Sequence, residues 1–523
     1  MSAALTPINP LDPADPTDPS NPTNLANPAK PPHPLPRPAR RLRAVLPPLP
    51  LPLPRRPAVL TWGLAAGFAA LYTCVAVNRH RRGLTKAFDL GIFEQAVRAY
   101  AHGRAPIVPL KAPGYDLLGD HFHPLLAALA PAYRAFPSPL TLVVAQALLM
   151  ALAVVPLTRW AHEVAGPRVA LLVGCATGAS WGIVRAAADD FHEIAFAVPL
   201  LAFAATALGR RRPLAAALWS LPLLLVKEDL GLTVGAVGLL IAWQARQDRR
   251  APLPGLALAV TGVLATAFTL LVVLPALNPN GGFDYWQQLD SGGGHSPLWA
   301  LPLRLGWPPI KWLLLFLLAA TTGFLGLRSP LVLLCAPTLA WRLLSTNPHH
   351  WGVSYHYSAV LMPIVFAALV DAVRRARAKE AADTPSKAAA PRRIRRALAV
   401  TALVTAVTLP LYPLHEVVMP EAWRTSPRLT ETQAMLRLIP DDATVAASNR
   451  LAAQLTSRTE ATLVCQEPVG DDPGPEWVAV DLQDPSVQSP CATAATARML
   501  TVYQEHGYHR LIDRDGLLLL RRP

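Results

Sequence analysis

The chain has 523 residues, of which 52% are hydrophobic and only 16% charged, whereas about a quarter of the residues of a soluble globular protein are charged. This composition argues against a water-soluble enzyme and is typical of a multipass membrane protein. The formal charge of +14 would suggest a nucleic-acid partner in a soluble chain. In a membrane protein the same cations gather on the cytoplasmic face, so we expect the lipid bilayer as a partner and no nucleic acid.

Residues 1–57 are rich in proline, with Asn-Pro and Asp-Pro repeats followed by arginine pairs. They contain no apolar run that could form a core or the hydrophobic region of a signal peptide. We therefore expect a disordered, partly polyproline tail on the cytoplasmic side.

Apolar runs long enough for membrane helices follow between residues 58 and 414, since a span needs about 20 apolar residues. They predict about eleven transmembrane helices, some of them short. The ranges are 58–77, 139–158, 169–186, 192–208, 213–226, 230–245, 253–277, 309–327, 330–345, 358–373 and 396–413. Three prolines interrupt the apolar run 122–137, which favours a re-entrant or interfacial helix there.

The distribution of lysine and arginine predicts the orientation, because short cytoplasmic loops carry an excess of these residues. An N-terminal tail on the inside also puts three arginine-rich segments inside, at 210–212, 246–250 and 374–396. The same parity puts the loop 78–138 and the chain after residue 414 on the outer face of the plasma membrane.

Residues 415–523 differ in composition, being charged, rich in turns and marked by short β-like runs. These runs alternate with helical stretches, which predicts a small extracytoplasmic α/β domain. The region has two cysteines, Cys465 and Cys491. Outside the cell they could form a disulfide; two independent buried thiols are the alternative.

The first outer loop carries two acidic residues just after the first span, Asp89 and Glu94. A carboxylate outside the membrane beside an interfacial helix is a candidate general base, and we assign that role to Asp89. Glu94 is a candidate substrate-binding residue. The alternative is structural: Asp89 caps a helix that begins at Leu90, and Glu94 lies on its solvated face.

The same loop continues to a second polar group formed by Asp120, His121 and His123. A carboxylate with two imidazoles could bind a diphosphate through a divalent cation. Asp120 and His121 are the candidate ligands for such an ion, magnesium or manganese.

Three further polar clusters lie at helix ends on the same predicted face. Ionisable residues at helix ends cost far less than at the bilayer centre, so solvated helix ends and interfacial anchors are the alternative to a binding role. The candidate substrate-binding residues of these clusters are His192, Glu193, Lys227, Glu228, Asp229 and His356.

Five separated motifs, in order, resemble a bacterial family of predicted multipass membrane proteins known as a domain of unknown function and grouped with the GT-C superfamily of membrane glycosyltransferases. The resemblance covers roughly residues 58–480. The motifs are Phe88 to Gln95, Asp120 to Pro124, Asp190 to Glu193, Lys227 to Gly231 and Tyr355 to Tyr357.

The resemblance implies a GT-C-like transmembrane domain over 58–414 and an enzyme that uses a lipid-linked sugar. Enzymes of this type carry an essential acid in the first outer loop, a position that Asp89 matches. The implied reaction transfers a sugar from a polyprenyl-phosphate donor to an unknown acceptor at the outer face. Lys227, His356 or a bound cation would neutralise the leaving phosphate.

Two other classes stay open at this point. One is a transporter or flippase of a lipid or polar solute, in which ionisable residues spread over the membrane depth would be expected. The other is a non-catalytic scaffold that anchors the outer domain.

Overall fold

The computed structural model describes residues 56–286, 301–382, 389–467, 474–484 and 490–523. Apart from Arg56 and Pro57, the tail predicted to be disordered lies outside the described residues. The first element is α1 (Pro57–Arg81), which begins with a proline in its first turn and ends with basic residues in its last turn. Both features stabilise a helix, the proline because its φ angle is preset and the cations because they face the negative end of the helix dipole.

The described residues contain five helices, or continuous helical stretches, that are long and apolar enough to cross a membrane, and a sixth if one bent pair is a single span. The five are Pro57–Arg81, Pro139–Ala165, Leu253–Leu277, His356–Glu380 and Pro391–Leu411. The bent pair consists of α6 (Pro167–Gly178) and α7 (Trp181–Ala188).

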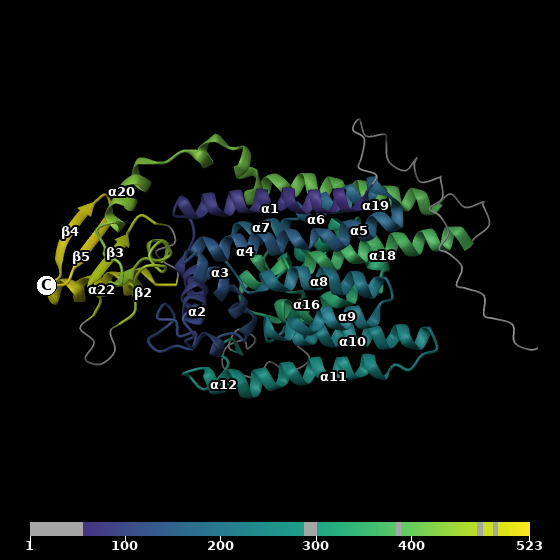
Figure 1. Ribbon diagram of the computed structural model, residues 1–523, viewed down its shortest axis with the longest axis horizontal. Coiled ribbons are helices and arrows are strands. Elements are labelled where there is room, and N and C mark those ends of the chain that lie inside the picture. Colours follow the sequence, from purple (N-terminus) through teal and green to yellow (C-terminus); the bar gives the residue numbers. More distant parts are fainter. Residues whose placement is uncertain (1–55, 287–300, 383–388, 468–473, 485–489) are drawn as a thin grey trace, which may run out of the picture. The chain divides into compact units, whose positions relative to one another are not determined.

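Helices also occupy every other range that the sequence predicts as a span (Figure 1). The elements of the bundle are α4 (Pro139–Leu152), α5 (Val154–Ala165), α8 (Ile194–Gly209), α9 (Pro213–Ser220), α10 (Leu230–Gln247), α11 (Leu253–Phe268), α12 (Leu274–Leu277), α14 (Leu301–Gly306), α15 (Ile310–Thr321), α16 (Ala336–Leu344), α18 (Leu361–Ala382) and α19 (Ala389–Thr408). Several are too short to span by themselves. The helical multipass class is therefore confirmed, while the count of eleven stays a prediction.

Close helix packing in the bundle depends on small residues. The antiparallel pair α10 and α11 meets through Gly238 and Gly255 (Figure 1). A Cβ atom on Gly238 would lie 2.4 Å from the backbone nitrogen of Ala259, and one on Gly255 would lie 2.4 Å from that of Ala242. Lipid tails are as apolar as leucine, so membrane helices associate through such tight backbone contacts rather than through hydrophobic burial alone.

Between α1 and α4 the chain forms only short helices. They are η2 (Ala87–Gly91), α2 (Ile92–Ala101), η3 (Leu117–Gly119), η4 (Pro124–Leu129) and α3 (Ala130–Ala135). The last two occupy the apolar run 122–137, where prolines divide the helix into pieces of six residues each. The prediction of a segment that does not span is therefore consistent with the structure.

The C-terminal part contains a five-stranded sheet with strand order β2-β1-β3-β5-β4. β1 is parallel to β2 and β3, whereas β5 is antiparallel to β3 and β4. The strands are β1 (Thr444–Ala447), β2 (Glu460–Leu463), β3 (Trp477–Asp481), β4 (His509–Arg514) and β5 (Leu517–Arg521); the helices are α20 (Pro427–Leu436), α21 (Asn449–Ala452) and α22 (Thr493–Glu505). The predicted small α/β unit is confirmed, and its side of the membrane stays a prediction.

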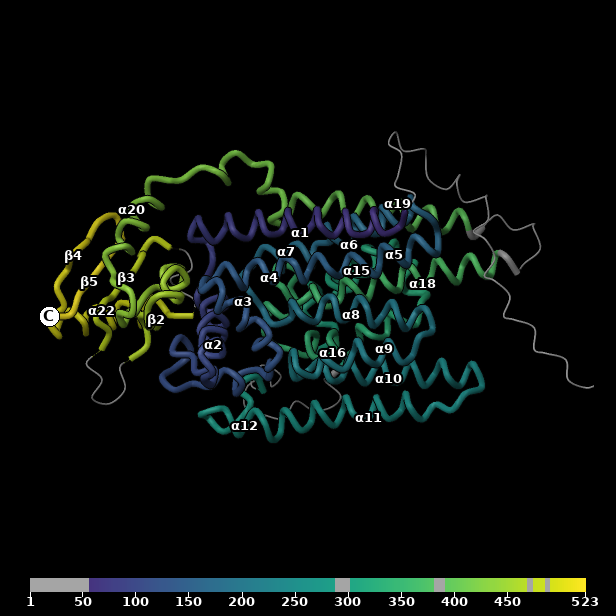
Figure 2. The backbone as a smooth tube through the Cα atoms, viewed as in Figure 1, coloured from purple at the N-terminus to yellow at the C-terminus, as the bar shows by residue number. Residues whose placement is uncertain are grey.

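The sheet domain contacts the first loop through α2, and the backbone path of both can be followed in Figure 2. Glu94 is fully buried and accepts hydrogen bonds from the hydroxyls of Tyr133, at 2.8 Å, and Thr456. Next to it, Gln95 donates to the carbonyl of Ala461 at 2.8 Å. The alternative that Glu94 lies on a solvated helix face is therefore wrong.

A disulfide joins Cys465 to Cys491, with a Cα–Cα distance of 5.6 Å and a sequence separation of 26 residues. Closing a loop of this length should stabilise the domain by about 2–4 kcal/mol, mainly by restricting the unfolded chain. We expect mass spectrometry of non-reduced peptides to find the two cysteines linked in exported protein. Reduction should lower the unfolding temperature of the wild type and leave a Cys465→Ser, Cys491→Ser variant unchanged. Two free thiols in exported protein would contradict the prediction.

The ionisation of Glu94 makes the stability of the contact between α2 and the sheet domain depend on pH. Burial raises the pKa of Glu94 to about 7, although the hydrogen bonds from Thr456 and Tyr133 oppose this rise. Because the pKa is higher in the folded protein, the stability from this group is full below about pH 4.5 and is lost as the pH rises through about 7.

Glu94→Gln should remove that titration and raise the free energy of unfolding at pH 8 by ~1–3 kcal/mol. Unfolding of the purified protein in detergent between pH 5 and 8 measures the effect. An unchanged pH dependence in Glu94→Gln would show that Glu94 does not titrate in this range.

Candidate functional site

Asp89 lies on η2, a single turn of π-helix in which Phe88 has non-helical backbone angles. Its carboxylate is inside the turn rather than before it and makes no capping hydrogen bond, so the capping alternative is wrong. The side chain is 41% exposed, whereas the backbone is fixed because the Phe88 N–H donates to the Asn449 side chain at 2.9 Å. The chain thus holds an accessible carboxylate on a constrained turn.

His192 lies beside Asp89, with 3.5 Å between its Nε2 and Oδ1 of Asp89. Its Nδ1 lies 2.8 Å from the carbonyl of Asp190, which can only accept, so Nδ1 carries a proton. Burial alone would lower the pKa of His192, but the carboxylates of Asp89, Asp189 and Glu193 together outweigh burial and raise this pKa to about 9. His192 is therefore a cation at neutral pH, and the pair is an ion pair.

The loop that carries His192 is held by Gln146 of α4. The Gln146 amide donates to the carbonyls of Ala186, at 2.8 Å, and Asp190, at 3.1 Å, and its oxygen accepts from the His192 N–H at 3.0 Å. Asp190 in turn accepts from the Lys86 N–H at 2.9 Å. Backbone positions on both sides of the ion pair are therefore fixed by side chains of the bundle.

Glu193, the residue after His192, forms an ion pair with Lys227 at 2.7 Å. Burial would lower the pKa of Lys227, but the carboxylates of Glu193, Glu228 and Asp229 together outweigh burial, so the pKa is raised. Burial would likewise raise the pKa of Glu193, but Lys227 and the nearby histidines lower it to about 2. Both groups are charged at neutral pH, and each neutralises the other.

Glu228 and Asp229, the next two residues, have separate partners. Glu228 pairs with Nδ1 of His121 at 2.8 Å and accepts from the Phe122 N–H at 3.1 Å. Asp229 accepts from the indole of Trp341 at 2.8 Å. Burial, and then the neighbouring Glu228, raise the pKa of Asp229 to about 6, whereas His121 holds the pKa of Glu228 below its usual value against the effect of burial.

Asp120 lies at the outer part of the cluster. It pairs with Lys111 at 3.0 Å and accepts from the Tyr285 hydroxyl at 3.2 Å. The Tyr285 ring stacks on His121 with 4.5 Å between centroids. Burial would raise the pKa of Asp120, but His121 and Lys111 together lower it.

Two further histidines belong to this group, the buried His123 and the half-buried His356. Burial lowers the pKa of His123 to about 4, and its Nδ1 has no hydrogen-bond partner in the part of the chain that the structure describes. The His356 ring lies against that of His192, with 3.5 Å between centroids. Both imidazole rings therefore line the site as neutral groups, and each could donate a hydrogen bond to a bound group.

The structure brings ten of the eleven predicted site residues into one electrostatically connected group; Glu94 lies apart at the contact with the sheet domain. The ten are Asp89, Asp120, His121, His123, His192, Glu193, Lys227, Glu228, Asp229 and His356. Sequence reasoning missed three members of the group, Lys111, Tyr285 and Trp341, which have no motif around them.

The predicted metal ligands have other partners in this arrangement. Asp120 is paired with Lys111, and His121 with Glu228. Within the described ranges, no group of three or more histidine, cysteine, aspartate or glutamate side chains could hold a metal ion. The donors at Asp120 and His121 therefore do not fit a divalent cation, and the steps proposed below use none.

The ion pair of Asp89 and His192 should appear in the titration of His192. With Asp89→Asn the pKa of His192 should fall from about 9 to near or below its ordinary value of about 6.5, because burial is then less opposed. The stability from the pair is full below about pH 6.5 and is lost as the pH rises through about 9.

Nuclear magnetic resonance of protein with labelled histidine, assigned with His192→Gln, measures this pKa. The control is Asp116→Asn in the same loop, where the Asp116 side chain accepts from the Leu118 N–H at 2.9 Å, a role that Asn can keep. An equal pKa of His192 in the wild type and in Asp89→Asn would contradict the assignment.

The chain is similar in structure to ArnT from Cupriavidus metallidurans, solved with bound undecaprenyl phosphate. The TM-score is 0.51 at 14% sequence identity, and the match covers 88% of this chain and 98% of ArnT. At this identity the likeness shows the fold alone. No curated protein matches the sequence.

The family comparison covers most of the chain and includes every predicted site residue. Residues 79–519 match the family described as "Predicted membrane protein (DUF2079)". The match begins near the end of α1 and ends within β5, so the sheet domain is part of the family's shared region. The chain therefore belongs to this family of predicted membrane proteins, the one that its five motifs resemble.

Proposed function

We propose that the chain is a glycosyltransferase that moves a sugar from a polyprenyl-phosphate donor to an acceptor hydroxyl at the outer face of the plasma membrane. The observation that carries the proposal is the accessible carboxylate of Asp89 beside the buried, cationic His192. An ionised carboxylate held on a constrained turn is suited to accept a proton from an attacking hydroxyl. The bound undecaprenyl phosphate of the structurally similar ArnT supports this class of lipid carrier.

The proposed reaction is a displacement at the anomeric carbon of the donor sugar. The acceptor oxygen forms the new glycosidic bond while the bond between the anomeric carbon and the phosphate oxygen breaks. The acceptor proton goes to Asp89, and the bonding electron pair leaves with the polyprenyl phosphate. His192, 3.5 Å from the Asp89 carboxylate, orients that carboxylate, so we regard His192 as a positioning residue.

The leaving phosphate needs a cation whose charge is not already compensated. Lys227 is already paired with Glu193 at 2.7 Å. Lys86 fits the requirement better, because its side chain is 35% exposed and its ammonium is 3.9 Å from Asp190. Burial, and then the charges of Asp189 and Asp89, raise the pKa of Asp190 to about 7, so Asp190 neutralises Lys86 only partly. We therefore assign the phosphate contact to Lys86, with His356 as a second donor.

The distribution of basic residues over the loops between helices supports the outer face as the side of the proposed site. A lipid carrier presents its phosphate at the membrane surface. Asp89 lies on η2, His192 and Glu193 directly precede α8, and residues 227–229 directly precede α10. At such helix ends a surface phosphate could reach the site without crossing the bilayer core.

Asp89→Asn should lower the rate of sugar transfer by about 10²- to 10⁴-fold, the usual cost of losing a general base. The side chain keeps its size, so the protein should stay folded and membrane-inserted. The assay follows transfer of labelled sugar from polyprenyl-phosphate donors to cell-envelope acceptors at matched expression of each variant.

Asp116→Asn, the same substitution in the same loop, is the matched control and should retain wild-type transfer. Lys86→Gln should weaken binding of undecaprenyl phosphate, measured separately with the purified chain. Wild-type transfer by Asp89→Asn would remove the base assignment and would favour the transporter or scaffold interpretation.

A further inference from the structure

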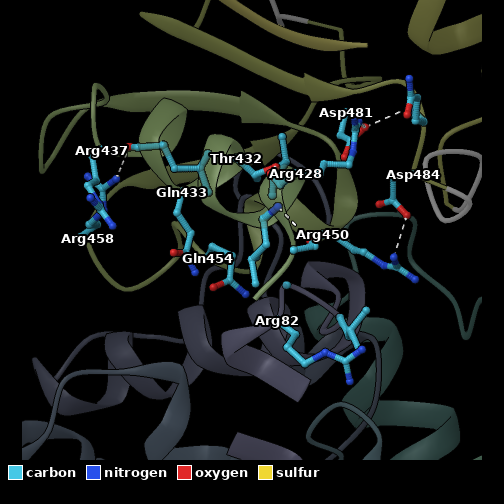
Figure 3. A pocket seen from close by; sticks show the side chains of 17 residues that line it. Arg82, Arg428, Thr432, Gln433, Arg437, Arg450, Gln454, Arg458, Asp481 and Asp484 are labelled. Carbon is cyan, nitrogen blue, oxygen red and sulfur yellow. Dashed lines mark hydrogen bonds and ion pairs between the residues drawn. The ribbon is translucent and has the colours of Figure 1, made fainter. Parts of the chain in front are cut away.

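A second polar site lies away from Asp89, in a cleft between the end of α1 and the sheet domain (Figure 3). Its volume is about 440 Å³, within the range of small-molecule sites. One wall is formed by the segment 82–84 that follows α1, and the other by α20, α21 and the end of β3. The cleft therefore adjoins the point where the first membrane helix ends.

The lining of this cleft is strongly basic, with five arginines against two aspartates. The arginines are Arg82, Arg428, Arg437, Arg450 and Arg458, and the aspartates are Asp481 and Asp484. Side chains of serine, threonine and glutamine add neutral hydrogen-bond donors. Such a surplus of guanidinium groups creates a positive potential that favours an anionic ligand.

The two aspartates of the cleft pair with only two of its five arginines, so part of the positive charge stays available to a ligand. Arg428 is paired with Asp481, and Arg450 with Asp484 at 3.2 Å. Arg437 is exposed, and its guanidinium has no hydrogen bond or ion pair within the described segments. The two aspartates are thus used by two arginines, and Arg437 retains its full set of donors.

Two further arginines of the cleft are only partly compensated. Arg82 lies 3.8 Å from Glu416, and Arg458 donates to two backbone carbonyls and pairs with the exposed Asp441 at 3.1 Å. Arg450 also has a buried Nε–H that meets no acceptor in the described part of the chain. A buried guanidinium donor without an acceptor is costly, and a bound oxyanion would satisfy it.

We propose that this cleft binds a phosphate-type oxyanion, either the phosphate of an anionic lipid headgroup or that of a soluble phosphate compound. Guanidinium groups match the planar, bidentate geometry of phosphate oxygens. Arg437 and Arg450 contribute the free donors, and Arg82 contributes a cation from the membrane side. The site is separate from the proposed transfer reaction, and neither depends on the other for its test.

The position of the cleft gives such a ligand a route to influence the first loop. Arg450 follows Asn449, whose side chain accepts from the Phe88 N–H beside Asp89. Across the cleft, Gln454 donates to the carbonyl of His80 at 3.2 Å. A bound anion would therefore contact α21, which also holds the turn that carries Asp89.

The experiment compares two double variants of the full-length chain that remove the same charge. Arg437→Gln with Arg450→Gln removes one unpaired and one ion-paired arginine of the cleft. Arg514→Gln with Arg498→Gln is the matched control outside the cleft, because Arg498 is paired with Glu467 at 2.6 Å and Arg514 is exposed. Arg437→Gln alone, at an exposed position, keeps the test usable if the double cleft variant does not fold.

The first arm measures binding of inorganic pyrophosphate to the protein in detergent by calorimetry. The second measures retention of phosphatidylglycerol, against phosphatidylcholine, in lipid nanodiscs by native mass spectrometry. We expect the cleft variant to lose about tenfold or more in affinity and the control to stay within about twofold of the wild type.

A loss confined to the pyrophosphate arm identifies a soluble phosphate ligand. A loss confined to phosphatidylglycerol identifies a lipid headgroup. Either result supports the proposal. Absence of binding in both arms, or equal losses in the cleft and control variants, overturns it.

Discussion

The structure of the site depends on the pairing of charges that are buried at one end of the helix bundle. An unpaired ion out of water costs several kcal/mol, and removing one partner of a buried pair is strongly destabilising. Lys227 and Glu193 neutralise each other at 2.7 Å, and Glu228 with His121 repeats this arrangement at 2.8 Å. These two ion pairs hold four side chains of the site in place. The carboxylate of Asp89 is exposed and stays accessible to a substrate.

The sheet domain takes part in this arrangement rather than being appended to it. Its Asn449 fixes the backbone of the turn at Phe88, and its Thr456 reaches the buried Glu94 of α2. A turn of π-helix is a poor hydrogen-bonding geometry and usually persists only where surrounding contacts hold it. The position of Asp89 therefore depends on a domain more than three hundred residues later in the sequence.

Sequence reasoning reached the membrane class, the sheet domain and most of the site because the signals are local. Apolar runs, helix-end charges such as Lys227 and short β runs can each be read within a window of a few residues. Tyr285 and Lys111 carry no such signal, since only the fold brings them to Asp120. The burial of Glu94 could not be predicted for the same reason, because it depends on contact with Thr456, far away in the chain.

Asp89 is more exposed than its charged neighbours. This difference separates the proposed reacting group from the residues that support it. Proton transfer requires a group that meets the substrate and can change charge, and the 41% exposure of Asp89 meets this requirement. Lys227 and Glu193 are shielded and hold each other's charge, so a change in either would cost the whole ion pair. His192 belongs to both kinds of group, because it is buried like the supporting residues and is paired with the accessible carboxylate of Asp89. It therefore connects the buried charges to the proposed reacting group.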